Sequence, residues 1–220
     1  MNLPNKITTS RFFITGAFVI VLLVEWQWAT TVACLLFFIG GLSDIADGEI
    51  ARRRNLKTDF GALMDPLADK IMVCAGFIVL VGMSAKAHPF VVDIPHVPHW
   101  LEVPGQDLLM PAWMVIVIVA RELAITGLRL LAVSKNVVLP AESIGKRKTN
   151  LQVVSVISVL VCVSYHHWGD WGPEIFTPEI AGAPWSIWFT LFVTWGAVLL
   201  TGISGIHYLW RNRDLYLKDM

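Results

Sequence analysis

Six long apolar segments dominate this chain, and they restrict the folds open to it more than any other feature. The segments span residues 10–27, 28–52, 61–85, 108–134, 149–168 and 185–210, and each is bounded by charged residues or by polar stretches rich in Pro, Gly and His. A helix needs about 20 mostly apolar residues to cross the roughly 30 Å hydrocarbon core of a bilayer. The pattern therefore predicts an all-α protein with six transmembrane helices.

Composition supports a membrane protein and excludes several other classes. Of the 220 residues, 55% are hydrophobic and 15% are charged, whereas soluble domains contain about 25% charged residues. The same values exclude a disordered chain. A net charge of zero excludes a globally basic protein that binds nucleic acid. No internal repeat divides the sequence, so we expect residues 1–220 to form a single membrane domain.

The basic residues predict the orientation of the six helices. They precede the first segment, lie between the second and third and between the fourth and fifth, and follow the sixth: Lys6, Arg11, Arg52, Arg53, Arg54, Lys57, Lys146, Arg147, Lys148, Arg211, Arg213 and Lys218. In a six-helix topology these positions fall on one side, and the other side carries Lys86 alone. Because Lys and Arg accumulate in cytoplasmic loops, we expect both termini in the cytoplasm.

Tryptophans and the start of the chain complete the topology. Six tryptophans stand at the opposite, outer ends of the segments, as expected at a membrane interface: Trp26, Trp28, Trp168, Trp171, Trp185 and Trp188. The positive start and first apolar run also resemble a signal peptide, and residues 31–34 resemble a lipoprotein cleavage site. Because Glu25 and two tryptophans interrupt the small-residue approach that cleavage needs, we expect no cleavage.

Four aspartates lie within the second and third segments, where ionisable residues are costly and usually functional. Asp44 and Asp47 lie near the cytoplasmic end of the second segment, and Asp65 and Asp69 lie near the start of the third. At about 100° per residue, each pair shares one face of its helix. If the short Arg-rich loop between the segments makes an antiparallel hairpin, the two acidic faces meet. Four converging carboxylates need cations, and oxygen ligands favour Mg²⁺, Mn²⁺ or Ca²⁺ over zinc.

Small residues share the acidic faces and predict a cleft beside them. Gly48 and Ala51 lie within the arc of the first aspartate pair, with Arg52 at its edge, and Gly61 lies with the second pair. Such residues let a ligand approach the backbone closely. One aspartate near a helix end is as well explained by an interfacial cap or a solvated charge. A cation transporter also uses intramembrane carboxylates but needs neither Arg52 nor the cleft, and it remains the alternative from another class.

The spacing D-x₂-D-G-x₂-A-R-x₈-G-x₃-D-x₃-D over residues 44–69 resembles the signature of the CDP-alcohol phosphatidyltransferases. All eight signature positions match: Asp44, Asp47, Gly48, Ala51, Arg52, Gly61, Asp65 and Asp69. The six-segment pattern extends the resemblance over nearly the whole chain. The resemblance implies an integral membrane transferase in which an alcohol attacks the pyrophosphate of CDP-diacylglycerol and releases CMP. It also implies a cofactor of two divalent ions, Mg²⁺ or Mn²⁺.

The resemblance further implies a role for each signature residue. Asp44, Asp47 and Asp65 are the implied metal ligands, and Asp69 completes the second metal site. Asp69 is also the implied catalytic base, which accepts the proton of the attacking hydroxyl. The implied contacts with CDP-diacylglycerol come from Asp44, Gly48, Ala51, Arg52, Thr58 and Gly61. Arg52 can form paired hydrogen bonds with phosphate oxygens, whereas Thr58 is equally well explained as an ordinary loop residue.

Basic residues on and after the fourth segment predict a second anion site. Arg121 and Arg129 are eight residues apart and therefore lie on one face of a helix. With Lys146 and Lys148 they could form a basic pocket for a phosphate dianion. Two simpler explanations stay open, because Glu122 could pair with one arginine and the basic loop could be an anchor for anionic lipid.

Three stretches resemble the family members whose acceptor is sn-glycerol 3-phosphate. They are LPNKITTSR at residues 3–11, TDFGALMDPLADK at residues 58–70, and the Arg121-Glu122 pair followed by GKRKTNLQ at residues 145–152. This resemblance implies that Arg121, Arg129, Lys146 and Lys148 bind glycerol 3-phosphate. It also implies a homodimer in a bacterial-type inner membrane, with the active site facing the cytoplasm. Family members that make cardiolipin or use inositol phosphate remain the alternatives within the family.

Overall fold

The computed structural model of the chain describes residues 3–24, 26–54, 59–85, 110–135, 137, 143–180, 183–213 and 215. Within these ranges, the description covers the backbone alone at residues 3–8, 44–54, 59–66, 69, 82–85, 133–134, 143–147 and 183. The described part is helical apart from one short hairpin, which confirms the all-α fold class.

Six long helices occur in the described part, one for each predicted segment. They are α1 (Leu3–Leu23), α2 (Ala29–Arg54), α3 (Asp59–Ala85), α4 (Ala112–Ser134), α5 (Ser143–Ser164) and α7 (Trp185–Arg211). Between α5 and α7 the chain forms a 3₁₀ turn, η1 (Tyr165–His167), and the short helix α6 (Trp171–Phe176). Two short strands, β1 (Glu179–Ile180) and β2 (Ala183–Pro184), follow and pair in antiparallel fashion. These short elements were not predicted, because two to six residues are too few to show a period.

Helix starts differ from the predicted segments for physical reasons. α1 begins at residue 3 rather than 10, and α5 at residue 143 rather than 149. Apolar windows locate the part of a helix that suits hydrocarbon, whereas backbone hydrogen bonding continues into the flanking polar residues. α4 begins later than predicted, directly after Pro111, whose carbonyl accepts a hydrogen bond from the Met114 N–H at 3.0 Å. A proline is tolerated there because helix starts leave N–H groups without intrahelical partners.

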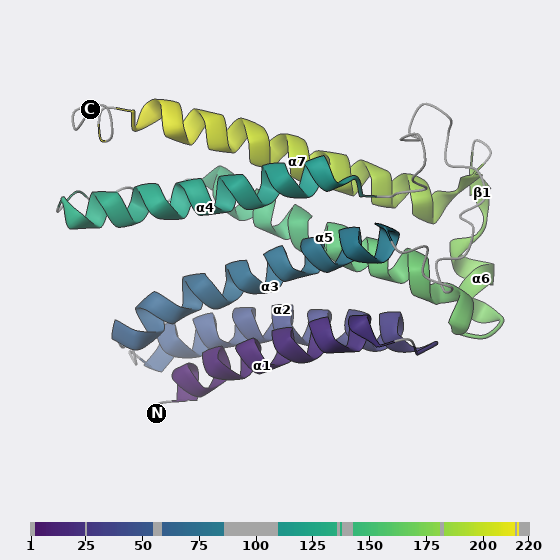
Figure 1. Cartoon of the computed structure of the whole chain (residues 1–220). Helices are drawn as coiled ribbons and strands as arrows, with labels where there is room; N and C mark the ends of the chain where they lie inside the picture. Colours follow the sequence, from purple (N-terminus) through teal and green to yellow (C-terminus); the bar gives the residue numbers. More distant parts are fainter. Residues whose placement is uncertain are drawn as a thin grey trace.

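The six long helices run side by side and alternate in direction (Figure 1). α1 packs against α2 and α3, α5 packs against α2 and α7, and α4 packs against α7 and α3. Large apolar side chains fill the core between them, including Phe18, Phe37, Phe77, Met114 and Leu160. The starts of α1 and α3 and the ends of α2, α4 and α7 lie toward the same end of the bundle (Figure 1).

Polar side chains join α5 to α7 along the length of their contact. Gln152 Nε2 donates to Thr201 Oγ1 at 3.0 Å, and the hydroxyls of Ser155 and Thr194 lie 2.8 Å apart. All four residues are buried. Hydrogen bonds between helices are a common means of association in lipid, where apolar contact alone does not favour helix pairing over lipid contact. This ladder therefore fixes the alignment of α5 and α7.

The end of the bundle that carries α6 holds an aromatic cluster. The rings of Trp168 and Trp171 stack with centroids 5.3 Å apart, and Phe176 lies 5.8 Å from Trp168 and 5.9 Å from Trp185. Trp168 Nε1 donates to Thr31 Oγ1 at 2.9 Å, which ties α2 to this end. Three of the tryptophans predicted to lie at the outer interface are thus in one cluster.

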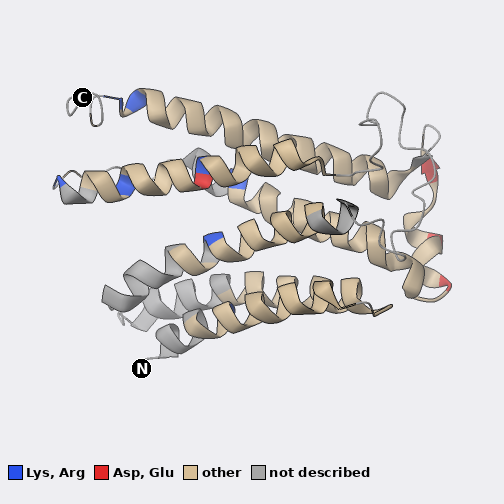
Figure 2. Cartoon of the chain, in the orientation of Figure 1, with Lys and Arg blue, Asp and Glu red and all other residues tan. Residues whose placement is uncertain are grey.

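Charged residues divide between the two ends of the bundle (Figure 2). Asp170, Glu174 and Glu179 lie at the end with α6 and β1, whereas Arg211 and Arg213 lie at the end of α7. Between the two ends, one acidic residue of α4 lies beside basic residues in the middle of the bundle. The distribution agrees with the charge asymmetry on which the predicted orientation depends.

Two described helical segments, Lys148–His167 and Trp185–Arg211, are long and apolar enough to cross a membrane. Three further apolar segments, in α1, α2 and α3, are shorter within the described side chains: Thr9–Leu23, Ala29–Ser43 and Lys70–Val81. Large apolar side chains also point outward, with Phe13 75%, Phe192 78% and Ile203 66% exposed. Extensive exposed apolar surface marks a region that another apolar phase covers, and lipid is such a phase.

Candidate active site

Side-chain contacts fix the alignment of α1, α2 and α3. The rings of Phe18 in α1 and Phe37 in α2 lie 5.4 Å apart. A Cβ atom at Gly40 of α2 would lie 2.6 Å from Met72 Sδ of α3 and 3.5 Å from Ile14 Cγ2 of α1. Glycine at this position therefore allows the close approach of the three helices. Ile14, Gly40 and Met72 therefore lie at the same height along the bundle, which is called one level of the three-helix contact below.

The four aspartates continue the same helix faces beyond that level. In α2, Asp44 and Asp47 follow Gly40 by four and seven positions. In α3, Asp69 and Asp65 precede Met72 by three and seven positions. Residues at such spacings share one face of a helix. Because α2 and α3 run in opposite directions, Asp44 lies level with Asp69, and Asp47 lies level with Asp65.

The remaining signature residues lie at the ends of α2 and α3. Gly48, Ala51 and Arg52 belong to the last two turns of α2, and Gly61 belongs to the first turn of α3. Thr58 lies outside the described residues, and so do the side chains of Arg52 and the four aspartates. Among the side chains that are described, no three His, Cys, Asp or Glu residues gather into a possible metal site. By residue type, the four aspartates would supply the carboxylate oxygens that Mg²⁺ and Mn²⁺ prefer as ligands.

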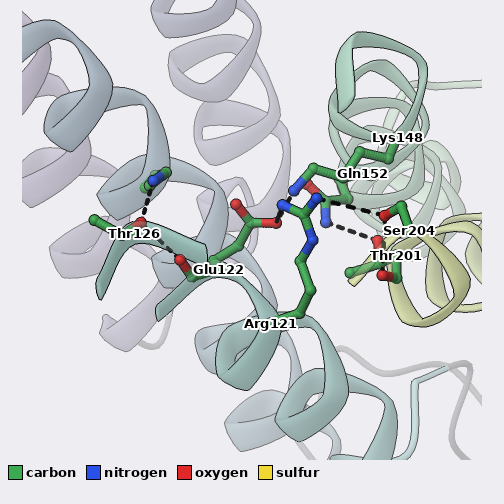
Figure 3. Close-up of polar contacts among 8 residues, drawn as sticks. Arg121, Glu122, Thr126, Lys148, Gln152, Thr201 and Ser204 are labelled. Atoms are coloured by element: carbon green, nitrogen blue, oxygen red, sulfur yellow. Dashed lines mark hydrogen bonds and ion pairs between the residues drawn. The ribbon is translucent and has the colours of Figure 1, made fainter. Parts of the chain in front are cut away.

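A buried charge cluster lies between α4, α5 and α7 (Figure 3). Glu122 of α4 is 7% exposed, and its Oε1 accepts a hydrogen bond from Arg121 Nη1 at 3.1 Å. The same oxygen pairs with Nζ of Lys148 in α5, and Lys148 is 3% exposed. The alternative in which Glu122 pairs with an arginine is thus confirmed, and the carboxylate also holds one predicted lysine. Arg121, Glu122 and Lys148 are called the Glu122 cluster below.

α7 provides the surface against which Arg121 lies. Arg121 Nη2 donates to Ser204 Oγ at 3.4 Å. A Cβ atom at Gly205 would lie 2.6 Å from Arg121 Cγ, so glycine leaves the room that the arginine side chain occupies. Beside the cluster, the Gln152–Thr201 hydrogen bond links α5 to α7 (Figure 3). The position of Arg121 therefore depends on the packing of α4 against α7.

α3 reaches the cluster through Lys70, the residue after Asp69. Lys70 Nζ donates to Thr126 Oγ1, and this hydroxyl donates to the backbone carbonyl of Glu122 at 2.7 Å. Three described positive groups therefore lie around the Glu122 carboxylate or next to it on α4. They belong to Lys70, Arg121 and Lys148. The sequence alone indicates no role for Lys70, because its neighbour on α4 depends on helix packing that no sequence period reveals.

The structure does not bring Arg129 into the Glu122 cluster. Arg129 lies about two turns along α4 from Arg121, is exposed, and has its guanidinium carbon 5.8 Å from the ring centroid of Tyr208 in α7. Lys146 lies in the first turn of α5, and its side chain is outside the described residues. Of the four residues predicted to bind the acceptor, Arg121 and Lys148 both contact Glu122 Oε1.

Comparison with known families shows which family the chain belongs to. Residues 1–203 match the model of the CDP-alcohol phosphatidyltransferase family. The chain therefore belongs to the CDP-alcohol phosphatidyltransferase family, which is a family of transferases. The resemblance based on the aspartate signature is confirmed.

Curated relatives narrow the comparison further. A CDP-diacylglycerol–glycerol-3-phosphate 3-phosphatidyltransferase of Bacillus subtilis (strain 168) is 34% identical over 96% of this chain and 95% of its own length. Proteins with the same name from Rickettsia bellii (strain RML369-C) and Salmonella paratyphi A (strain ATCC 9150 / SARB42) are 30% and 31% identical. Each of these two alignments covers 94% of this chain and 93% of the relative.

Proposed function

We propose that this chain transfers the phosphatidyl group from CDP-diacylglycerol to sn-glycerol 3-phosphate, giving phosphatidylglycerophosphate and CMP. Membership of the family supports the transfer chemistry, and the names of near-full-length relatives support this donor and acceptor. The structural observation that carries the choice of acceptor is the excess of described positive groups around Glu122. A small acceptor with a phosphate dianion fits such surroundings.

The donor side of the proposed site is the face shared by α2 and α3. Asp44, Asp47, Asp65 and Asp69 would hold two divalent cations, Mg²⁺ or Mn²⁺, and the levelled positions of the two pairs support this assignment. Such ions, when bound, neutralise the pyrophosphate and the charge on the leaving group. The paired donors of Arg52 suit phosphate oxygens.

Small residues complete the proposed donor site. Gly48 and Ala51 near the end of α2, and Gly61 near the start of α3, leave room for the cytidine and pyrophosphate to lie against the helix backbones. Thr58 would add a hydroxyl contact. Since these residues flank the aspartate levels, the donor would lie across the cytoplasmic ends of α2 and α3.

The transfer itself requires a proton acceptor. An acceptor hydroxyl oxygen attacks the phosphorus that carries the diacylglycerol group, a new phosphorus–oxygen bond forms, and the bond from that phosphorus to CMP breaks. CMP leaves with the electron pair of that bond. An alcohol is a weak nucleophile at neutral pH, so its proton must be removed during attack. We assign this role to Asp69, and Lys70 beside it connects the same turn of α3 to α4.

The acceptor side of the proposed site is the Glu122 cluster. Arg121 and Lys148 would donate hydrogen bonds to the phosphate of glycerol 3-phosphate, with Lys70 adding positive charge from α3. Glu122 keeps the guanidinium and ammonium groups close together in the buried interior, where unpaired charges are costly. Arg129 and Lys146, which lie nearer the cytoplasmic end, would attract the substrate before it reaches the cluster.

The same proposal includes the membrane arrangement. The six long helices would each cross a bacterial-type inner membrane, with both termini and the active site on the cytoplasmic side, and two copies would form a homodimer. The apolar outer surface, the shared end of the helix termini and the separated charges support the membrane orientation.

A parallel acceptor assay tests the proposed reaction. Purified protein with Mg²⁺ and CDP-diacylglycerol is given glycerol 3-phosphate, inositol phosphate or phosphatidylglycerol, and CMP and lipid products are measured. We expect CMP and phosphatidylglycerophosphate with glycerol 3-phosphate and no CMP with the other two. CMP release with either of the others, and none with glycerol 3-phosphate, would refute the acceptor assignment. Absence of CMP with all three would instead favour cation transport.

Substitution of the aspartates tests the proposed donor site in the same assay. Asp44→Asn, Asp47→Asn and Asp65→Asn should each lose most activity, because each removes a negative charge where dications bind. Asp69→Asn should also lose activity but should lose less affinity for metal and donor, since its main role is proton transfer. Turnover by Asp69→Asn at the wild-type rate would exclude Asp69 as the base.

A further inference from the structure

α1 contributes a fully buried positive charge to the bundle interior. Arg11 is 0% exposed, and it lies on the helix face that carries Ile14 and Phe18, three and seven residues further along. Both of those residues contact α2 or lie at the three-helix contact. Burial of a guanidinium group is costly unless negative charge lies close to it. The surroundings of Arg11 therefore must include compensating groups.

The α1–α2 alignment places Arg11 beside one signature aspartate. The two helices run in opposite directions, and Ile14 of α1 meets Gly40 of α2, where a Cβ atom would lie 3.5 Å from Ile14 Cγ2. Arg11 lies three residues before Ile14 in α1, and Asp44 lies four residues after Gly40 in α2. Both steps keep to the face of the helix that makes the contact. Arg11 and Asp44 therefore lie at the same level.

The α1–α3 alignment, taken from the same contact point, agrees with this placement. These helices run in the same direction, and Ile14 and Met72 approach the same point at Gly40. Arg11 lies three residues before Ile14 in α1, and Asp69 lies three residues before Met72 in α3. The alignments of α1 with α2 and of α1 with α3 thus agree on one level for the arginine and the two aspartates.

We propose that Arg11 is a positioning residue of the aspartate site. Its guanidinium group offsets part of the negative charge of Asp44 and Asp69, and so keeps these carboxylates ionised and aligned before divalent cations bind. Through Arg11, α1 is part of the active-site structure rather than a membrane anchor alone. The inference rests on the proposed cation site between α2 and α3, and extends it to a third helix.

This role has a consequence for cation affinity that a packing role lacks. A fixed positive charge near the aspartates opposes the binding of a dication as well as holding the carboxylates in place. Removing one unit charge within several ångströms of a dication changes their interaction by well over 1.4 kcal/mol at an effective dielectric constant of about 20. We therefore expect Arg11→Met to bind Mn²⁺ at least about tenfold more tightly than the wild type, while its unfolding temperature without metal falls.

The test measures Mn²⁺ binding and thermal unfolding of the full chain in detergent, without substrate. Arg11→Lys, which keeps the charge, should bind Mn²⁺ with near wild-type affinity. Thr15→Val is the matched packing control, because Thr15 Oγ1 donates to the Arg11 carbonyl at 2.8 Å on the same buried part of α1. It should leave Mn²⁺ affinity unchanged whatever it does to unfolding. If Arg11→Met cannot be purified, Arg11→Gln replaces it as the neutral variant.

Two results separate this inference from the function on which it rests. The neutral Arg11 variant could bind Mn²⁺ with wild-type affinity and unfold at a temperature that is lowered equally with and without Mn²⁺. That result would show that Arg11 only fills space and would overturn the inference. Failure of the wild type to bind Mn²⁺ at all would overturn the proposed cation site itself, and the inference with it. Tighter binding in the neutral variant, restored to the wild-type value in Arg11→Lys, supports both.

Discussion

Substitution of Gly205 by alanine tests whether Arg121 must hold its observed position to bind the acceptor. A Cβ atom at Gly205 would lie 2.6 Å from Arg121 Cγ, whereas carbon atoms pack without strain at about 3.5–4.0 Å. Because Cγ is close to the backbone of α4, the clash cannot be relieved by movement of the side-chain tip alone. Arg121 must shift by about 1 Å or more away from α7, where Ser204 accepts its hydrogen bond.

The size of the effect follows from that displacement. A misplacement of about 1 Å in a positioning group can reduce the rate about 100-fold. Loss of one hydrogen bond to a charged group corresponds to about 1.5–3 kcal/mol, or roughly 10- to 100-fold in kcat/KM. We therefore expect Gly205→Ala to lower kcat/KM for glycerol 3-phosphate by about 10- to 100-fold, chiefly through KM. The KM for CDP-diacylglycerol should stay near the wild-type value.

Gly202→Ala is the matched control for the same helix. Its Cβ atom would lie 3.9 Å from Val117 Cγ1, which is an ordinary contact, and both substitutions add the same helix propensity. CMP release is measured while glycerol 3-phosphate is varied at saturating donor, and then the reverse, with unfolding temperatures recorded for all three proteins. A wild-type KM for glycerol 3-phosphate in Gly205→Ala would show that the position of Arg121 does not govern acceptor binding.

Three further predictions concern other parts of the molecule. In a variant without native cysteines, a cysteine at Glu179 should react with an impermeant thiol reagent added outside whole cells and one at Arg213 should not; the reverse pattern would invert the topology. Arg129→Ala should raise the KM for glycerol 3-phosphate by less than 10-fold, because Arg129 lies outside the Glu122 cluster, and an effect as large as that of Gly205→Ala would contradict this placement. Gln152→Leu and Thr201→Val should each lower the free energy of unfolding by about 1 kcal/mol, and additive losses in the double variant would exclude coupling between the two residues.

The helices could be predicted because their apolar segments are long and clearly bounded. All six long helices correspond to predicted segments, and the differences lie at their ends. α6 and the β1–β2 hairpin escaped prediction, since their formation depends on contacts such as the hydrogen bond from Trp185 Nε1 to the Ile175 carbonyl at 2.8 Å. Such contacts join residues ten positions apart and leave no local period in the sequence.

The site was predictable where its residues share a helix face, and less so where several helices meet. The spacing of the aspartates predicts one acidic face on α2 and one on α3, because periodicity within a helix is regular; the side chains that would test this prediction lie outside the described residues. The eight-residue spacing of Arg121 and Arg129 also placed them on one helix, but it could not show that one contacts Glu122 and the other Tyr208. The contact of Lys70 with Thr126 and the burial of Arg11 depend on packing between helices, which single-helix patterns do not contain.

The arrangement of α3 explains how two anionic substrates can react between separate groups of charges. Positions 69 and 70 are adjacent and therefore lie about 100° apart around α3. Asp69 lies on the face that meets α1 and α2, whereas Lys70 reaches Thr126 of α4. One turn of α3 therefore belongs to both the proposed donor side and the acceptor side. Because α3 is packed between these helices, the proposed base and the charges around Glu122 keep a fixed separation, which is the condition for holding a hydroxyl in line with the phosphorus that it attacks.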